Sequence, residues 1–136
     1  MNALFTAIMN KLSGTTLETL VSGRVYLDQP KPGPLVFPYV VFFVVTSNQQ
    51  DVFKNQLDNI LIQFSIFSAS RGMVEVTAIY EALRATFDDA ALSISDSTLI
   101  WMIRQNLTTM VEDVTAQDST SSIKHWAVDY SVLVQR

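Results

Sequence analysis

Few side chains in this sequence have the types and spacing that acid–base or nucleophilic chemistry requires. His125 is the only histidine and there is no cysteine, so a hydrolase of the Ser/His/Asp type would have to use this one imidazole. Asp129 lies on the same face of the predicted strand. Four residues of extended chain separate the two side chains by roughly 13 Å, which is beyond hydrogen-bond reach. We therefore interpret His125 as a solvent-facing residue on a half-exposed strand and predict no catalytic residues.

The sequence also gives no support for a metal or nucleotide site. The adjacent acidic pairs are Asp88–Asp89 and Glu112–Asp113, and each stands at the end of a predicted element. A solvated helix end or turn is the simpler interpretation, because a Ca²⁺ or Mg²⁺ loop needs further oxygen ligands at regular spacing. The four glycines are dispersed and form no phosphate-binding cluster. We predict neither a cofactor nor a metal.

Composition and charge exclude further classes. The net charge is −4 and the nine Lys and Arg residues are scattered, whereas nucleic-acid binding requires clustered cations. The aromatic residues stand among Val, Ile and Leu, a pattern that favours core packing over base stacking. The longest proline-free apolar run, Tyr39 to Val45, is too short to cross a bilayer, and the N-terminus lacks a secretory signal. We expect a soluble protein with no membrane partner.

Hydrophobic periodicity predicts how the chain begins. Residues 3–12 place apolar side chains at helical spacing, and Gly14 follows where a helix would end. A second helical segment up to Gly23 precedes a short strand at 25–27, and the proline-rich stretch 30–34 predicts a loop. The 136 residues, 49% of them apolar, suit one domain spanning 1–136.

Longer elements build the predicted core. They are the strands 38–45 and 57–68, the helix 72–87, and the strands 99–111 and 123–134. In the second strand, alternate positions place Ile60, Ile62, Phe64 and Ile66 on one face. The helix repeats apolar residues at steps of three and four, so its stripe can cover that face. The pattern predicts an α+β fold: an antiparallel sheet with long hairpins packed against one main helix, plus a short helical N-terminus.

Three features of the hairpins point to contacts with other proteins. Phe42 and Phe43 are adjacent on one strand and must point to opposite faces, so either both faces are covered within the domain or a second subunit covers one. The stretches 48–56 and 113–122 are polar and join long strands. We expect both stretches to be mobile loops that dock on partners.

The order of these segments resembles the tail-completion or tail-terminator proteins of long-tailed bacteriophages. The residues that carry the resemblance are the Gly-Arg-Val-Tyr at 23–26, the proline-rich loop, Pro38 to Phe42, Ser70 to Gly72, the helix with Ile79, Leu83 and Arg84, and the closing strand Trp126 to Val134. The likeness extends over nearly the whole chain. Each motif is weakly specific, and their order and spacing make the case.

The resemblance implies a structural, non-enzymatic protein of the virion tail that assembles in the host cytoplasm. Such a protein forms a homo-oligomeric ring of six subunits at the head-proximal end of the tail, ends tube growth and joins the tail-tube protein to the head connector protein. DNA would pass through the ring without specific binding, which is compatible with the net negative charge of the chain. The residues that we expect at partner interfaces are Asn48, Gln49, Gln50, Asp51, Phe42, Phe43, Gln117 and Asp118.

Two alternatives remain open from the sequence. One is another neck or tail-tube protein of the same virion. The other is a small cytosolic enzyme or ligand-binding module with a pocket between helix and sheet, for which the sequence lacks an acid, base and nucleophile set.

Overall fold

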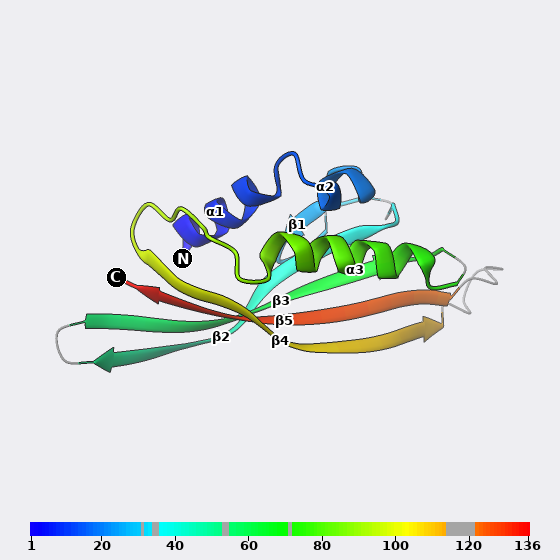
Figure 1. Ribbon diagram of the computed structural model, residues 1–136. Coiled ribbons are helices and arrows are strands. Elements are labelled where there is room, and N and C mark those ends of the chain that lie inside the picture. The colour runs from blue at the N-terminus through cyan, green and yellow to red at the C-terminus, as the bar shows by residue number, and fades with distance from the viewer. Residues whose placement is uncertain (31, 34–35, 53–54, 71, 114–121) are drawn as a thin grey trace.

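A computed structural model describes residues 1–30, 32–33, 36–52, 55–70, 72–113 and 122–136. The described residues form three helices and five strands, whose arrangement is drawn in Figure 1. In chain order they are α1 (Asn2–Leu12), α2 (Thr16–Leu20), β1 (Val25–Leu27), β2 (Tyr39–Val52), β3 (Asn55–Ser68), α3 (Val74–Phe87), β4 (Thr98–Asp113) and β5 (Ser122–Gln135). The elements expected from the sequence are all present, so the α+β prediction is confirmed.

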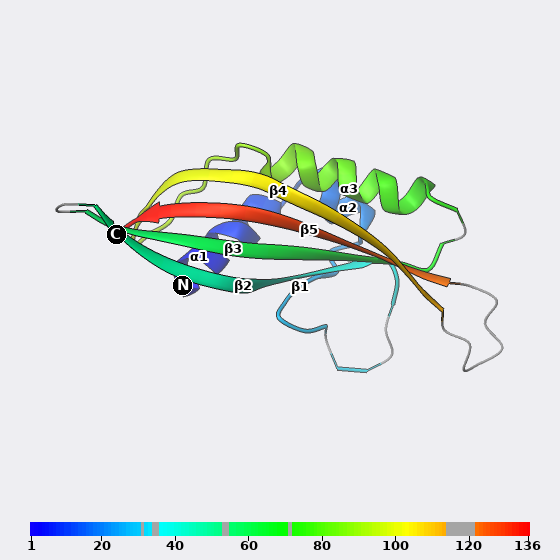
Figure 2. The same cartoon turned by 90° about the horizontal axis from the view of Figure 1, so that it is seen from below.

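The strands form one sheet in the order β1-β2-β3-β5-β4. The four long strands pair in antiparallel fashion, while β1 lies parallel to β2 at the edge. Parallel pairing requires the chain to return to the start of the strand, and the connection between residues 27 and 39 is long enough to do so. Figures 1 and 2 show the helices on one face of the sheet, which leaves the other face open.

The main helix covers the face of β3 that alternation predicted to be buried. Ile60, Ile62, Phe64 and Ile66 are at most 3% exposed, and Val76, Ile79, Leu83 and Phe87 of α3 are fully buried. The rings of Phe64 and Phe87 stack with their centroids 4.8 Å apart. Alternate residues of β5 extend the same core, because Val128, Tyr130 and Val132 are fully buried. The apolar stripe of the helix and the apolar faces of the strands therefore pack together in one buried layer.

The N-terminal helices fill the remainder of this layer. Leu4, Ile8 and Leu12 of α1 lie in the core with Leu17 of α2. The start of α2 is capped by Thr15, whose hydroxyl oxygen accepts a hydrogen bond from the backbone N–H of Glu18 at 3.3 Å. Such a cap satisfies one of the donors that a helix N-terminus leaves unpaired.

The polar stretch 48–56 departs from the expected loop. Within the described residues, β2 continues to Val52 and β3 begins at Asn55, with Asn48 opposite Asn59 and Gln50 opposite Leu57. The prediction of a connector was wrong because backbone hydrogen bonds hold a ladder together whatever the side chains are. Polar side chains suit this part of the hairpin, which projects beyond the helices (Figure 1). Of the second polar stretch, residues 114–121 lie outside the described residues.

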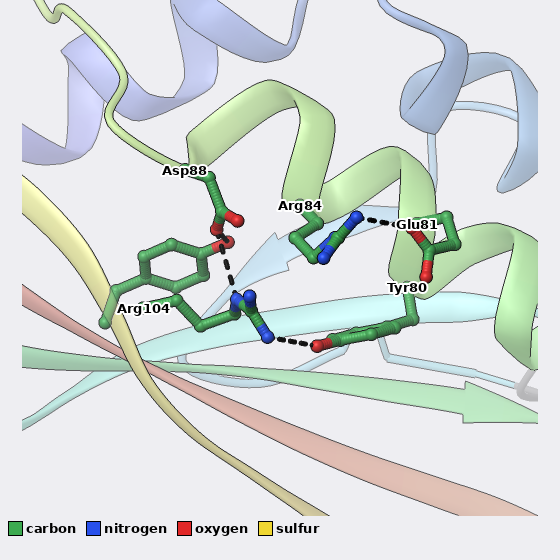
Figure 3. Close-up of polar contacts among 6 residues, drawn as sticks. Tyr80, Glu81, Arg84, Asp88 and Arg104 are labelled. Atoms are coloured by element: carbon green, nitrogen blue, oxygen red, sulfur yellow. Dashed lines mark hydrogen bonds and ion pairs between the residues drawn. The ribbon is translucent and has the colours of Figure 1, made fainter.

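A polar cluster joins the C-terminal end of α3 to the sheet (Figure 3). The hydroxyl of Tyr130 donates to Asp88 Oδ1 at 2.7 Å, and Arg104 Nε donates to the same oxygen at 3.3 Å. Arg104 Nη1 also donates to the hydroxyl of Tyr80. Because Tyr80 lies in α3 and Asp88 is its C-cap, while Arg104 and Tyr130 belong to β4 and β5, the cluster ties three elements together.

This cluster affects the ionisation of the buried phenol. Burial of Tyr130, with its hydrogen bond to the Asp88 carboxylate and the charge of that carboxylate, raises the pKa of the phenol above its ordinary value. The folded protein therefore binds the phenolic proton more tightly than the unfolded chain does.

The packing of α3 predicts a large effect of one truncation. Leu83→Ala should lower the free energy of unfolding by about 2 to 5 kcal/mol, because it removes buried methyl groups and leaves a cavity. Urea denaturation would measure the change. Glu81→Ala is the matched control, since Glu81 lies on the exposed side of the same helix and forms a surface pair with Arg84 at 3.2 Å; its effect should stay within about 0.5 kcal/mol. Equal effects of the two substitutions would contradict this packing.

The polar cluster predicts a pH dependence. Tyr130→Phe should cost about 1 to 3 kcal/mol at pH 8, because Asp88 loses a buried donor. In the unfolded wild-type chain this phenol ionises near pH 10, whereas the folded state holds its proton, so the wild type loses stability as pH rises above about 10. The variant lacks this dependence. The difference in unfolding free energy between the wild type and Tyr130→Phe should therefore become smaller between pH 8 and pH 11. A difference that stays constant over this range would refute the link between the raised pKa of Tyr130 and stability.

Candidate interaction surface

The described residues hold no group of three or more His, Asp or Glu side chains that could bind a metal ion. None of the helices among them is both long and apolar enough to cross a membrane. His125 is half-buried rather than solvent-facing, because its ring stacks on Phe67 with centroids 4.2 Å apart. Asp129 accepts a hydrogen bond from Gln63 Nε2 at 2.9 Å instead of pairing with the imidazole.

The pair Asp88–Asp89 is more than the solvated helix end that the sequence suggested. Asp88 is held by Tyr130 and Arg104, as described above, and the backbone N–H of Asp89 donates to the carbonyl of Met102 at 3.1 Å. Sequence spacing could not reveal this cluster, because its members come from α3, β4 and β5. The cluster positions α3 on the sheet, and its polar side chains hydrogen-bond to one another.

The open face of the sheet carries an aromatic hollow near the start of β2. Tyr39 stacks on Phe67 with centroids 4.8 Å apart. His125, near the start of β5, stacks on the same phenyl ring with centroids 4.2 Å apart. Together with Val41 and Phe43 these residues line an open depression of about 250 Å³. The depression can receive an apolar side chain.

The two adjacent phenylalanines of β2 have different environments. Phe42 is fully buried under the helices, where its ring contacts Phe5 and Phe64 with centroids 6.2 and 5.6 Å apart. Its expected role at a partner interface is therefore wrong, because the subunit itself covers that face. Phe43 points to the open face and lines the aromatic hollow. Of the pair, Phe43 alone is accessible to a partner.

The polar residues expected at an interface fall at one end of the sheet. Asn48, Gln49 and Gln50 are exposed on the distal part of β2, and Asp51 pairs with Gln56 in the ladder. The β2–β3 hairpin and the paired strand ends at Asp113 of β4 and Ser122 of β5 lie at opposite ends of the sheet (Figure 1). Gln117 and Asp118 lie outside the described residues.

Sequence reasoning missed the exposed apolar residues of β4. Ile100, Trp101 and Ile103 are 46%, 41% and 41% exposed. The run Leu99 to Ile103 contains five consecutive apolar residues, and alternation cannot place all of them on the buried face. This run was the signal that could have identified an apolar surface at the edge of the sheet.

The fold is similar to that of two solved structures. A chain of the virion of a native gene transfer agent particle superposes with a TM-score of 0.78 at 20% identity, covering 99% of this chain and 96% of that chain. A second solved structure superposes with a TM-score of 0.58 at 13% identity and covers 96% of this chain and 94% of that chain. At these identities the likeness concerns the fold. No curated protein matches the sequence.

The family comparison covers more of the chain than any local motif does. Residues 3–135 match the family model described as tail completion protein gp17. That span includes every strand of the sheet, all of α3 and nearly all of α1. The resemblance of the sequence to tail-completion proteins is therefore confirmed, and this chain belongs to the tail completion protein gp17 family.

Proposed function

We propose that this protein is the subunit of a ring at the head-proximal end of a phage-type tail, where it ends tube growth and joins the tail to the head connector. The observation that carries the proposal is the family match over residues 3–135. The protein acts by contact with other virion proteins and not by catalysis. It assembles in the host cytoplasm and remains in the virion.

The shape of the subunit supports a role between two different partners. The β2–β3 hairpin lies at one end of the sheet, and the paired ends of β4 and β5 at Asp113 and Ser122 lie at the other (Figure 1). If the strands lie roughly along the tail, one end of each subunit faces the tube and the other faces the connector. The exposed polar residues Asn48, Gln49 and Gln50 are suited to such a contact, since transient and assembly interfaces have polar rims.

The charge distribution supports passage of DNA through the ring. Several described cations are occupied within the subunit: Arg24 donates to the carbonyls of Phe37 and Pro38, and Lys124 donates to the carbonyl of Ser70. By strand register, the described positions on the open face of the four long strands hold no Lys or Arg. DNA retention depends on neutralising phosphates with such cations, so this face would not hold the passing duplex.

Deletion of the gene tests the function directly. Phage particles without this protein should contain heads and unjoined tails, with tails of irregular length, because nothing closes the growing end. Adding the purified protein should restore joining, as counted by electron microscopy and by plaque titre. Tails of normal length that join to heads without the protein would refute the terminator role. Tubes that fail to form at all would favour the alternative of a tail-tube or other neck protein.

A substitution in the hairpin tests its contact role. Gln50→Arg should reduce the yield of joined particles about tenfold, which corresponds to about 1.4 kcal/mol of lost contact energy, because an unpaired charge would have to be desolvated at the interface. The melting temperature should not change. Ala85→Arg, on the exposed side of α3, is the matched control and should join normally.

The absence of catalysis has its own test. His125→Ala should retain joining in a protein that still folds, as checked by circular dichroism. Complete loss of joining in that folded variant would contradict a mechanism based on contact alone.

A further inference from the structure

The sheet has two exposed edges that belong to different strands. β4 is the last strand in the sheet order and has no strand on its outer side. At the other edge β1 pairs only with residues 40–42 of β2, so the part of β2 beyond Phe42 has no outer strand among the described residues. Exposed edges present backbone groups and side chains that can contact another chain.

The β4 edge lacks two common protections against such contact. Residues 98–111 contain neither proline nor lysine. The single arginine, Arg104, turns its guanidinium to Asp88 and Tyr80 inside the subunit. Three apolar side chains, Ile100, Trp101 and Ile103, remain exposed.

The register places the two edges at the same height along the strands. Ile103 of β4 is opposite Ser131, which is opposite Leu61, which is opposite Thr46 of β2. The same three strand pairings, β4 with β5, β5 with β3 and β3 with β2, place Trp101 at the same height along the strands as Asn48. β2 and β4 also run in opposite directions, since three successive antiparallel pairings connect them. A second copy placed beside the first would bring β4 next to β2 in antiparallel orientation.

We propose that the β4 edge of one subunit contacts residues 44–47 of β2 in a second copy of this chain. Ile100, Trp101 and Ile103 are the apolar contacts on one side, and Val45 and Thr46 lie opposite them. The inference rests on the proposed ring and specifies which surfaces form it. The contact is made by side chains rather than by a continuous backbone ladder, because the register shifts at Ile100 and Gln105, and Asp89 already binds the carbonyl of Met102.

Such a contact would close into a ring. It joins two different patches of the same chain, and a heterologous contact repeated by rotation either closes or forms a helical filament. Because both patches lie at the same height, neighbouring subunits need no shift along the strands. A closed ring leaves no exposed β4 edge, which removes the risk of uncontrolled association that a long apolar edge carries.

Cross-linking can test this contact, because the natural chain contains no cysteine. We would make Ile103→Cys and Thr46→Cys as single variants and as a double variant. Assembled particles would then be treated with a short bismaleimide that spans about 5 to 8 Å, which is the distance between cross-strand neighbours. Within one chain three strand spacings separate the two positions by roughly 14 Å, so the linker joins different copies. The control pair is Thr46→Cys with Val74→Cys, which is 85% exposed on the helical side.

The proposed contact gives a distinctive pattern. The double variant should produce a ladder of cross-linked species up to the full ring, while each single variant and the control pair should produce only monomers. Dimers from Ile103→Cys alone would show that two β4 edges meet each other, and a cross-link to a different virion protein would show that another partner covers the edge; either result overturns the inference. Particles that join normally but give no ladder would refute the contact while leaving the ring function intact, whereas tails of normal length that join to heads in the deletion experiment would refute the function itself.

A second variant measures the energy of the same contact. Trp101→Ser should weaken subunit association at least about tenfold in sedimentation analysis, since a large aromatic contact is lost, without lowering the melting temperature of the monomer. Trp101→Phe should restore most of the association. Unchanged association of the serine variant would overturn the inference.

Discussion

Burial of one face of β3 and β5 beneath α3 is the interaction on which the rest of the structure depends. Side chains in a strand alternate with a period of two, so a shift of one residue in register would move the whole apolar set of β3 to the open face. The stacking of Phe64 on Phe87 and the full burial of Leu83 fix that register. The positions of both hairpins and of both sheet edges follow from it.

The polar cluster at the end of α3 completes this packing. Asp88, whose side chain is 32% exposed, receives hydrogen bonds from Tyr130 and Arg104, and loss of the buried Tyr130 donor would leave this part-buried carboxylate less well satisfied. The cluster therefore fixes the end of the helix over β4 and β5. The cluster also directs the Arg104 guanidinium towards Asp88 and Tyr80, so it does not lie beside the exposed apolar residues Ile100, Trp101 and Ile103 of β4.

The same arrangement separates the stable core from the surfaces available for assembly. The helical layer covers one face of the sheet, while no helix covers the open face and the β2–β3 hairpin projects beyond the helices. A subunit of this kind can present different surfaces along the tail and around it. That separation suits a member of the tail completion protein gp17 family, because contacts with other proteins can form without disturbing the core.

The sequence by itself determined the elements and their buried faces, because periodicity records which residues avoid water. The alternation of Ile60 to Ile66 and the helical stripe of 72–87 were sufficient for this, and the order of segments was sufficient for the family. Tertiary structure decided the rest. Backbone hydrogen bonding, to which side-chain polarity is a poor guide, extended β2 through Asn48 to Val52. Long-range packing buried Phe42, brought Asp88 to Arg104, and left Trp101 exposed at an edge, since these outcomes depend on which strands become neighbours in space.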